Sequence, residues 1–352
     1  MKNVFFILSY SHLGGAETRA IDIALHLKNN CIPIFIVYGK PNGKVQYILD
    51  ENNIIYIERL PFNWKSKYKG LDVIFRLFLE MKFIIKKYYY YRPYSMISFC
   101  ADANIFLSLA NIFIQNKNTY WCQVDDFIQW RWKRIFLYAI KNSKNVISVS
   151  NFITRQINSK CGTLKKIITI PNSINPTLLY VNKKTSEKIR ISIVGHINRI
   201  KNQGYAIQAI EELILENRLT DVELNLYGMI SDTNYWKEIK IKKDWFFYRG
   251  YQSKNEIYNN TDILLIPSLS ESFSLVLHEG NFFNLDILCS NIDVFKETTV
   301  PDLIFFELDD KEDLKKAIVS KIFCARENKK NNKIDYIKKY NEYVNHYREI
   351  LI

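Results

Sequence analysis

Short apolar runs alternate along the chain with longer segments in which apolar residues recur every three or four positions. Short runs rich in β-branched and aromatic residues are typical of buried strands, and the longer periodic segments are typical of helices. Their regular alternation predicts βαβ units and parallel sheets. In the first half, the runs that we interpret as strands are residues 4–9, 32–38, 54–57, 96–99, 119–122, 146–149 and 167–170.

The same alternation restarts after a polar stretch at residues 182–188. We therefore predict an α/β protein of two doubly wound, Rossmann-like domains, residues 1–180 and 188–332. Residues 333–352 have apolar positions spaced mostly by three and four, which predicts a helix, and we expect it to pack back across the domains. The second series of predicted strands is residues 189–194, 222–227, 245–248, 263–266 and 287–290.

Length and composition agree with two cores and exclude a membrane-spanning protein. The chain has 352 residues, 48% of them hydrophobic, and lacks an uninterrupted apolar stretch long enough to span a bilayer. The first apolar run is too short for a signal peptide. The six cysteines show neither metal-ligand spacing nor the density of a disulfide framework, which indicates reduced thiols. We therefore expect a cytoplasmic protein.

The formal net charge of +13 favours an anionic partner, although a biased composition explains it equally well. Nucleic acid, an anionic membrane face and phosphorylated substrates are the candidate partners. The positive residues are dispersed and no nucleic-acid-binding module is recognisable, so we do not expect a nucleic-acid partner.

The first candidate binding motif is the pair Gly14 and Gly15, between the first predicted strand and a helical pattern over residues 16–27. Glycines let the backbone approach a ligand closely, and a helix N-terminus offers amide groups to a phosphate. A tight turn without a ligand would have the same sequence. The dinucleotide fingerprint G-x-G-x-x-G is absent, which argues against an NAD enzyme.

The second motif follows the strand at residues 189–194, where a glycine turn carries His196, Arg199 and Lys201. The carboxyl end of a parallel strand is where α/β proteins bind diphosphates. Lys201, with Arg199 or His196, has the charge to neutralise one. A solvated basic loop is the alternative interpretation.

The third motif places Glu271 and Glu279 eight residues apart, after the predicted strand at residues 263–266. Glu279 lies about one turn inside the helix that Ser274 would open, so it can point towards a ligand held at that N-terminus. Each carboxylate can accept two sugar hydroxyls. Because the surrounding residues are apolar, a chance pair of surface glutamates is the less favoured alternative.

Taken in order, these motifs resemble glycosyltransferase family 4, whose members have the GT-B fold, act on nucleoside-diphosphate sugars and retain anomeric configuration. In that fold two Rossmann-like domains face each other across a cleft. The resemblance covers nearly the whole chain. The matching segments are residues 14–17, 149–150, 170–173, 195–202, Gly250, 267–268 and the pair Glu271 and Glu279.

The resemblance implies a role for each motif. Gly14 and Gly15 would meet the donor diphosphate from the acceptor domain, and Lys201 would bind it from the other side. Glu279 would hold the ribose hydroxyls, and Glu271 would bind the transferred sugar. The remaining donor contacts would come from the backbone amides of Ser274, Leu275 and Val276, and from Tyr251 at the nucleotide base.

The chain also departs from the family pattern. His196 stands where the family usually has an arginine beside the lysine, and Arg199 is displaced from that position by three residues. The family's small residues after the second glutamate, and its glycine pair before Glu297, are replaced. The replacing residues are Phe282, Phe283, Asn284, Asp286, Asp293 and Val294.

No Asp-x-Asp pair occurs in the chain, so we expect a donor site without a metal or other cofactor. The resemblance implies that the leaving phosphate helps to deprotonate the acceptor. Asp125 follows a predicted strand end in the first domain and is our candidate for the acceptor side. An Asx turn or helix cap before Phe127 explains the same residue.

Residues 64–92 carry a net charge of +6, nearly half of the excess. Their helical part, about residues 71–91, is also rich in apolar side chains, a pattern suited to an anionic leaflet. An ordinary core-facing helix with a basic outer side is the alternative. The first interpretation predicts a lipid-linked or saccharide acceptor in surface polysaccharide biosynthesis and peripheral contact with the inner face of the cytoplasmic membrane.

Three other functions fit parts of the sequence. A sugar-nucleotide epimerase or a phosphorylase would use the same scaffold, without a separate acceptor or with inorganic phosphate. A non-catalytic, membrane-associated paralogue would use the basic helix alone.

Overall fold

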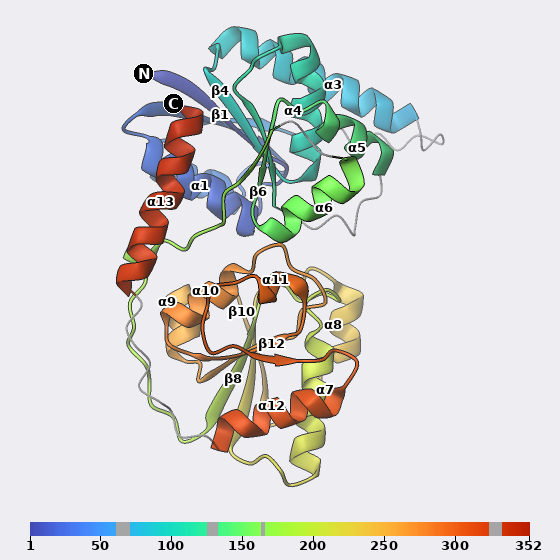
Figure 1. Ribbon diagram of the computed structural model, residues 1–352, viewed down its shortest axis with the longest axis vertical. Coiled ribbons are helices and arrows are strands. Elements are labelled where there is room, and N and C mark those ends of the chain that lie inside the picture. The colour runs from blue at the N-terminus through green and yellow to red at the C-terminus, as the bar shows by residue number, and fades with distance from the viewer. Residues whose placement is uncertain (61–70, 125–132, 163–165, 324–332) are drawn as a thin grey trace. The chain divides into compact units, whose positions relative to one another are not determined.

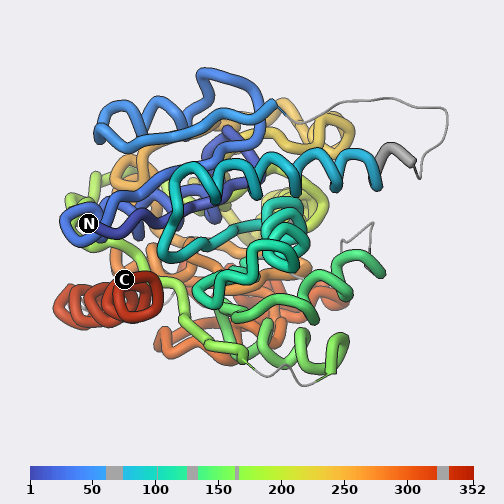
Figure 2. Tube along the Cα trace, turned by 90° about the horizontal axis from the view of Figure 1, so that it is seen from above, coloured from blue at the N-terminus to red at the C-terminus, as the bar shows by residue number. Residues whose placement is uncertain are grey.

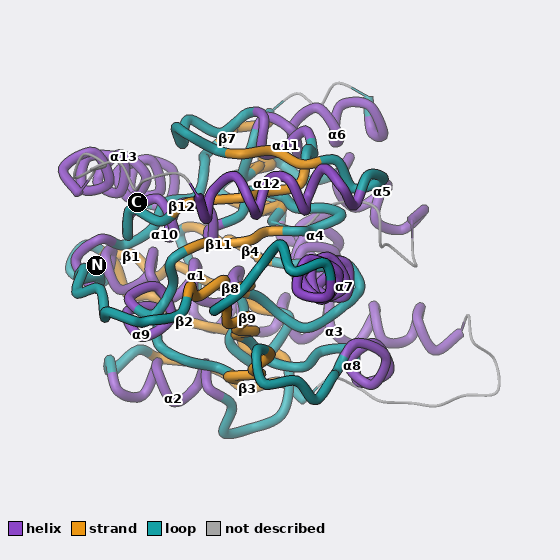
Figure 3. Tube along the Cα trace, turned by 90° about the horizontal axis from the view of Figure 1, so that it is seen from below, coloured by secondary structure: helices purple, strands orange, loops and turns teal. Residues whose placement is uncertain are grey.

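The computed structural model contains two compact α/β units, each with one parallel sheet and helices on both faces (Figures 1 and 3). The first unit comprises Met1–Asn172 and Asn341–Ile352, and the second comprises Ser173–Tyr340. The predicted class, two doubly wound α/β domains, is confirmed. The residues that the structure describes are 1–60, 71–124, 133–162, 166–323 and 333–352.

The first unit has a seven-stranded parallel sheet in the order β3-β2-β1-β4-β5-β6-β7. Its register sets Val4 of the central strand beside Pro33 and Ser95. Its elements are β1 (Lys2–Leu8), α1 (Gly15–Leu27), β2 (Cys31–Tyr38), α2 (Lys44–Glu51), β3 (Ile55–Arg59), α3 (Leu71–Tyr91), β4 (Ser95–Phe99), α4 (Ala101–Ile114), β5 (Thr119–Gln123), α5 (Lys133–Lys141), β6 (Asn145–Ser148), α6 (Asn151–Cys161) and β7 (Ile167–Thr169).

The central strands of this sheet are apolar almost throughout because helices cover both of their faces. Every residue of β1 from Val4 to Leu8 is fully buried. On one face, Phe5 and Ile36 pack with Ile84 of α3 and Phe106 of α4. None of the cysteines that the structure describes forms a disulfide.

The second unit has a six-stranded parallel sheet in the order β10-β9-β8-β11-β12-β13. It opens with a 3-10 turn at Pro176–Leu178. Its further elements are β8 (Ile189–Val194), α7 (Gln203–Leu215), β9 (Val222–Tyr227), α8 (Thr233–Ile239), β10 (Phe246–Gly250), α9 (Lys254–Asn259), β11 (Ile263–Ile266), α10 (Leu275–Phe282), β12 (Asp286–Ser290), α11 (Asp293–Lys296), β13 (Ile304–Phe306) and α12 (Lys311–Phe323). The last helix, α13 (Lys333–Leu351), begins in the second unit and ends in the first.

Two close approaches in the second unit require glycine. Gly228, after β9, has φ +138°, and a β-carbon there would lie 2.0 Å from the Gly195 carbonyl oxygen after β8. A β-carbon on Gly280 would lie 2.3 Å from Leu264 Cδ2, so α10 packs directly on β11. These contacts fix the loops at the carboxyl ends of the strands, and they fix the helix that carries Glu279.

The predicted C-terminal helix is confirmed as α13, which contributes residues to both units. In the second unit, Asn281 of α10 donates to Tyr336 Oη at 2.9 Å. In the first unit, Arg19 of α1 donates to Tyr343 Oη at 3.0 Å and also to Tyr347 Oη. Three tyrosines of α13, Tyr336, Tyr343 and Tyr347, therefore attach the helix through their hydroxyl groups.

The strand β13 was missed by the sequence analysis. It has three residues, which is too short to show a period of two. It pairs with β12 through Leu288 and Ile304 and completes the sheet.

A buried ion pair holds β8 to the segment before β11. Arg190 Nε donates to Asp262 Oδ2 at 3.0 Å, its Nη2 donates to Oδ1 at 3.2 Å, and its backbone amide also donates to Oδ2. Both side chains are buried, so each charge depends on the other for its solvation.

We expect Arg190→Leu to destabilise the second unit by about 3–5 kcal/mol, because it removes the buried cation that balances the Asp262 charge. Amide hydrogen exchange of β8 in urea measures this unit by itself. The matched control is Arg199→Leu, which removes an exposed pair with Glu238 and costs about 1 kcal/mol or less. If both variants lose the same free energy of unfolding, the larger contribution expected of the buried pair is contradicted.

Candidate functional site

Lys201 and Glu271, 70 residues apart in the sequence, form an ion pair with 2.5 Å between Nζ and Oε1. Ser268 Oγ donates to the same carboxylate oxygen at 2.9 Å. Asn198 Oδ1 accepts the backbone amides of Ile200 and Lys201, which orders the loop that carries the lysine. The side chains of Lys201 and Glu271 are 24% and 12% exposed, so the pair is accessible to a ligand.

The ion pair lies where the strand order of the second sheet reverses. Lys201 follows β8 and Glu271 follows β11, and these strands are neighbours in the sheet although β9 and β10 separate them in the chain. Open α/β sheets bind ligands at the carboxyl ends of their strands at this switch point.

The N-terminus of α10 adds a second polar feature. Ser274 caps the helix with φ +67°, and among the residues that the structure describes its buried Oγ has no hydrogen-bond partner. The first amides of a helix, here including Leu275 and Val276, have no partner within it. A buried unpaired hydroxyl beside a positive helix end suits an anionic or hydroxyl-bearing ligand.

Glu279, in the same helix, is 5% exposed and bonds to two side chains of α9. Tyr258 Oη donates to Oε2 at 2.5 Å, and Lys254 Nζ lies 2.6 Å from Oε1. Burial, and then the Glu279 charge, raise the pKa of Tyr258 well above its usual value, so the hydroxyl stays protonated. Sequence reasoning missed both partners, although their spacing of four residues places them on one helix face.

The structure places the other predicted residues of this unit as follows. Arg199 pairs with Glu238 of α8 at 2.5 Å, and its guanidinium is thus engaged there. The His196 carbonyl accepts Gln203 Nε2 at 2.9 Å. Tyr251, directly after β10, is 56% exposed. Their predicted roles towards a donor stay predictions.

In the first unit, Gly14 and Gly15 stand at the start of α1, as the sequence pattern predicts. The Gly14 amide donates to Glu17 Oε2 at 3.1 Å, so it already has an acceptor within the protein. A β-carbon on Gly15 would meet nothing within 4 Å. Asp125 lies outside the described residues. The phosphate role of the glycines and the acceptor-side role of Asp125 stay predictions.

One group of carboxylates in the described part of the chain is close enough to hold a metal ion: Glu212, Glu216 and Glu312. The buried ammonium of Lys315 bonds to all three, at 2.5 Å from Glu216 and 3.5 Å from Glu212. The cluster therefore has a cation of its own and joins α7 to α12. It contains none of the predicted site residues.

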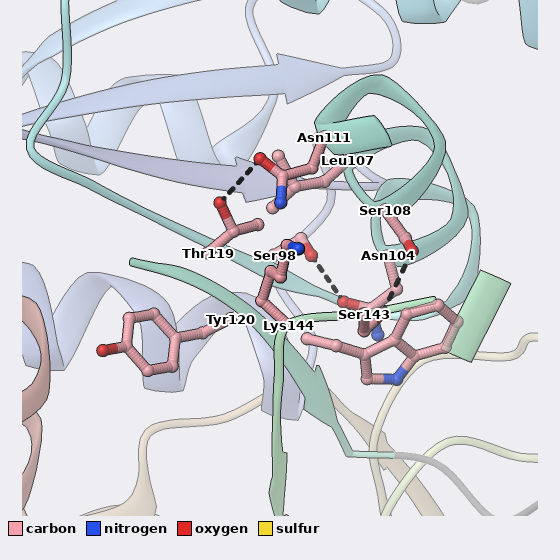
Figure 4. A pocket seen from close by; sticks show the side chains of 10 residues that line it. Ser98, Asn104, Leu107, Ser108, Asn111, Thr119, Tyr120, Ser143 and Lys144 are labelled. Carbon is pink, nitrogen blue, oxygen red and sulfur yellow. Dashed lines mark hydrogen bonds between the residues drawn. The ribbon is translucent and has the colours of Figure 1, made fainter. Parts of the chain in front are cut away.

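Two cavities in the first unit are poor candidates for a nucleotide. One, about 10 Å³, lies among hydroxyls and amides between α4 and β5 and has room for about one water (Figure 4). Ser98 donates to Asn104 across it. The other, about 280 Å³, lies by Cys31 and Ile55 at the amino ends of β2 and β3, opposite the edge where α/β sheets bind ligands.

Residues 188–322 match the family model described as Glycosyl transferases group 1. The second unit thus matches a glycosyltransferase family, as the motifs predicted; the narrower assignment to family 4 stays a prediction. The crystal structure of Anabaena Alr3699/HepE in complex with UDP and glucose is similar, with a TM-score of 0.80, 14% sequence identity, and coverage of 100% of this chain and 99% of that chain. The fold is confirmed as GT-B.

Two curated relatives match part of the chain. The O-antigen chain mannosyltransferase RfbU of Salmonella typhimurium is 26% identical over 202 residues, 55% of this chain and 56% of that protein. An uncharacterized 41.2 kDa protein in the cps region of Klebsiella pneumoniae is 28% identical over 114 residues, 32% of this chain and 30% of that protein. The chain thus matches about half or less of their length. Within its described part, no helix combines the length and apolar character needed to cross a bilayer.

The residue before Glu279 is an uncharged histidine. The His278 ring stacks on Phe273 with 4.6 Å between centroids and meets the edge of Tyr336 at 6.4 Å. Burial, and then the Lys339 charge, lower the pKa of His278 from 6.5 to about 4. The stack connects the Glu271 loop to α10 and α13.

Because the folded pKa of His278 is below the unfolded value, its unfolded form binds more protons between these values. The stability that the neutral stack contributes is therefore fully present above pH 6.5, and it is lost as the pH falls towards 4. We expect urea midpoints of the second unit to fall more between pH 7 and 4.5 in the wild type than in His278→Leu. The free energy of unfolding should fall more steeply with falling pH in the wild type than in the variant, by at most about 1.4 kcal/mol per pH unit. If the urea midpoints of the wild type and of His278→Leu fall by the same amount between pH 7 and 4.5, this prediction is refuted.

Proposed function

We propose that the protein is a retaining, metal-independent glycosyltransferase. It transfers a hexose from a UDP- or GDP-sugar to a saccharide or lipid-linked acceptor in surface polysaccharide biosynthesis. The observation that carries this proposal is the convergence of Lys201, Glu271 and the N-terminus of α10 at the switch point of the second sheet. The group 1 family match, the mannosyltransferase relative and the neighbour crystallised with UDP and glucose support it.

Lys201 and the N-terminus of α10 stabilise the leaving diphosphate in this proposal. Breaking the bond between sugar and phosphate develops negative charge on the diphosphate and positive charge on the sugar ring. In the structure the Lys201 ammonium pairs with Glu271. A bound diphosphate offers more charge, so Lys201 turns to it while Glu271 becomes available to the sugar hydroxyls. The leaving phosphate takes the proton from the acceptor hydroxyl, which attacks the sugar on the face that the phosphate leaves. The anomeric configuration is therefore retained.

The acceptor proposal rests on the exposed stripe of α3. This helix lies on the surface of the first unit (Figure 2). Ile74, Phe75 and Phe78 in its first half are 64%, 41% and 57% exposed, and the exposed residues Lys82 and Lys86 continue the stripe at intervals of four. Apolar side chains followed by ammonium groups suit an anionic leaflet, where a lipid-linked acceptor would be found. Residues 64–70 of the predicted segment lie outside the described part.

The two glutamates have different proposed tasks, and free nucleotide distinguishes them. Glu279→Gln should weaken binding of free UDP or GDP by about 1–3 kcal/mol, because the ribose hydroxyls lose a charged acceptor. Glu271→Gln should hardly change it, because the free nucleotide has no sugar for Glu271 to contact.

Calorimetric titration in EDTA measures both variants, with the wild type as the reference. A wild type that binds neither nucleotide would contradict the donor proposal. Equal losses in the two variants, or a loss only in Glu271→Gln, would mean that the roles are wrong. A requirement for magnesium or manganese would contradict the metal-free site.

The α3 stripe is tested by flotation with lipid vesicles. We expect the double variant Ile74→Ser and Phe78→Ser to reduce binding to vesicles containing phosphatidylglycerol tenfold or more, because each side chain loses burial worth about 1.5–3 kcal/mol. The matched control replaces Ile112 and Phe113, exposed apolar residues of α4. Equal binding by wild type and double variant, or no preference for anionic over neutral vesicles, would contradict the membrane proposal.

A further inference from the structure

Glu279 contacts two residues of α9 that are one helical turn apart. Lys254 and Tyr258 are four residues apart on α9, and Glu279 and Phe283 are four residues apart at the end of α10. Residues with this spacing share a helix face. Tyr258 meets both members of the facing pair: its hydroxyl donates to Glu279, and its ring lies 5.2 Å from that of Phe283 at an angle of 31°.

The two partners of Glu279 differ in how firmly they hold it. Tyr258 and Phe283 are fully buried, so the tyrosine hydroxyl cannot exchange its acceptor for water. Its 2.5 Å contact with Oε2 has the length of a charge-assisted hydrogen bond. The Lys254 side chain is 45% exposed, so water can solvate its ammonium group when the group leaves the carboxylate. Tyr258 therefore determines the orientation of the carboxylate.

Both contacts leave acceptor capacity on Glu279. An ionised carboxylate can accept about four hydrogen bonds, and Tyr258 and Lys254 account for two. Two vicinal ribose hydroxyls can take the remaining positions, provided that the carboxylate does not rotate. If the Glu279 carboxylate rotates, its hydrogen bonds to the ribose hydroxyls weaken, because hydrogen bonds weaken steeply when their angle is poor.

We propose that Tyr258, buttressed by Phe283, is a positioning residue that fixes the Glu279 carboxylate for recognition of the donor ribose. This inference rests on the proposed function and adds the means by which the site distinguishes ribose from deoxyribose. It also accounts for Phe283, which replaces a small residue of the family pattern. The large ring packs against the ring of Tyr258.

The test compares nucleotides that differ by one hydroxyl. Calorimetry measures UDP against 2′-deoxy-UDP, and GDP against 2′-deoxy-GDP, in the wild type and in Tyr258→Phe. We expect the wild type to prefer the ribonucleotide about tenfold or more, and Tyr258→Phe to reduce this preference at least threefold, towards that of Glu279→Gln. A purely structural role would weaken both nucleotides equally and leave the ratio unchanged, which would overturn the proposal.

Tyr205→Phe is the matched control, because its hydroxyl donates to the Glu307 carbonyl at 3.3 Å and the substitution removes the same atom. This control should keep the wild-type ratio of the affinities for ribonucleotide and deoxyribonucleotide. A reduced ratio in Tyr205→Phe as well would overturn the assignment to Tyr258. Phe283→Leu, which removes the buttress but keeps the hydroxyl, should lower the ratio less than Tyr258→Phe. It decides the question if Tyr258→Phe does not fold. A wild type that binds no nucleotide refutes the proposed function, whereas one that binds without preferring ribose refutes the inference alone.

Discussion

Parallel pairing of β8 with β11 is the constraint on which the candidate site depends. These strands are neighbours in the sheet, with Ile263 opposite Ile191, while β9 and β10 lie between them in the chain. The pairing brings the loops after the two strands together, and the Leu269 amide donates to the Ile200 carbonyl at 2.8 Å. Lys201 and Glu271, 70 residues apart in the chain, then meet at 2.5 Å.

The second unit uses two kinds of ion pair for two purposes. Arg190 and Asp262 are buried and satisfy each other through several hydrogen bonds, so their pair holds strands together. Lys201 and Glu271 are partly exposed, and each keeps bonding capacity that a ligand can use. Breaking the buried pair would leave a charge away from water, which is costly, whereas water can solvate the partly exposed pair when its partners separate.

The departures of this chain from the family pattern also have physical explanations in the packing. Phe283 fills the space beside Tyr258, and Phe282 contacts Tyr336 of α13 with 5.8 Å between centroids. Arg199 is engaged by Glu238. Bulky residues around α10 thus replace small ones by packing against aromatic partners from α9 and α13, without disturbing the close contact of Gly280 with β11.

The sequence by itself determined the two parallel-sheet units and the C-terminal helix, and it singled out Glu271 and Glu279 as candidate site residues. These features follow from local periodicity and from short motifs, which a linear pattern contains. It did not determine β13, because three residues have no visible period, or the hydrogen bond that engages the Gly14 amide with Glu17. It also did not reveal that Tyr258 and Lys254 hold Glu279. Only the tertiary structure decided these contacts, because a helix pattern states which residues share a face but not which neighbouring helix that face meets.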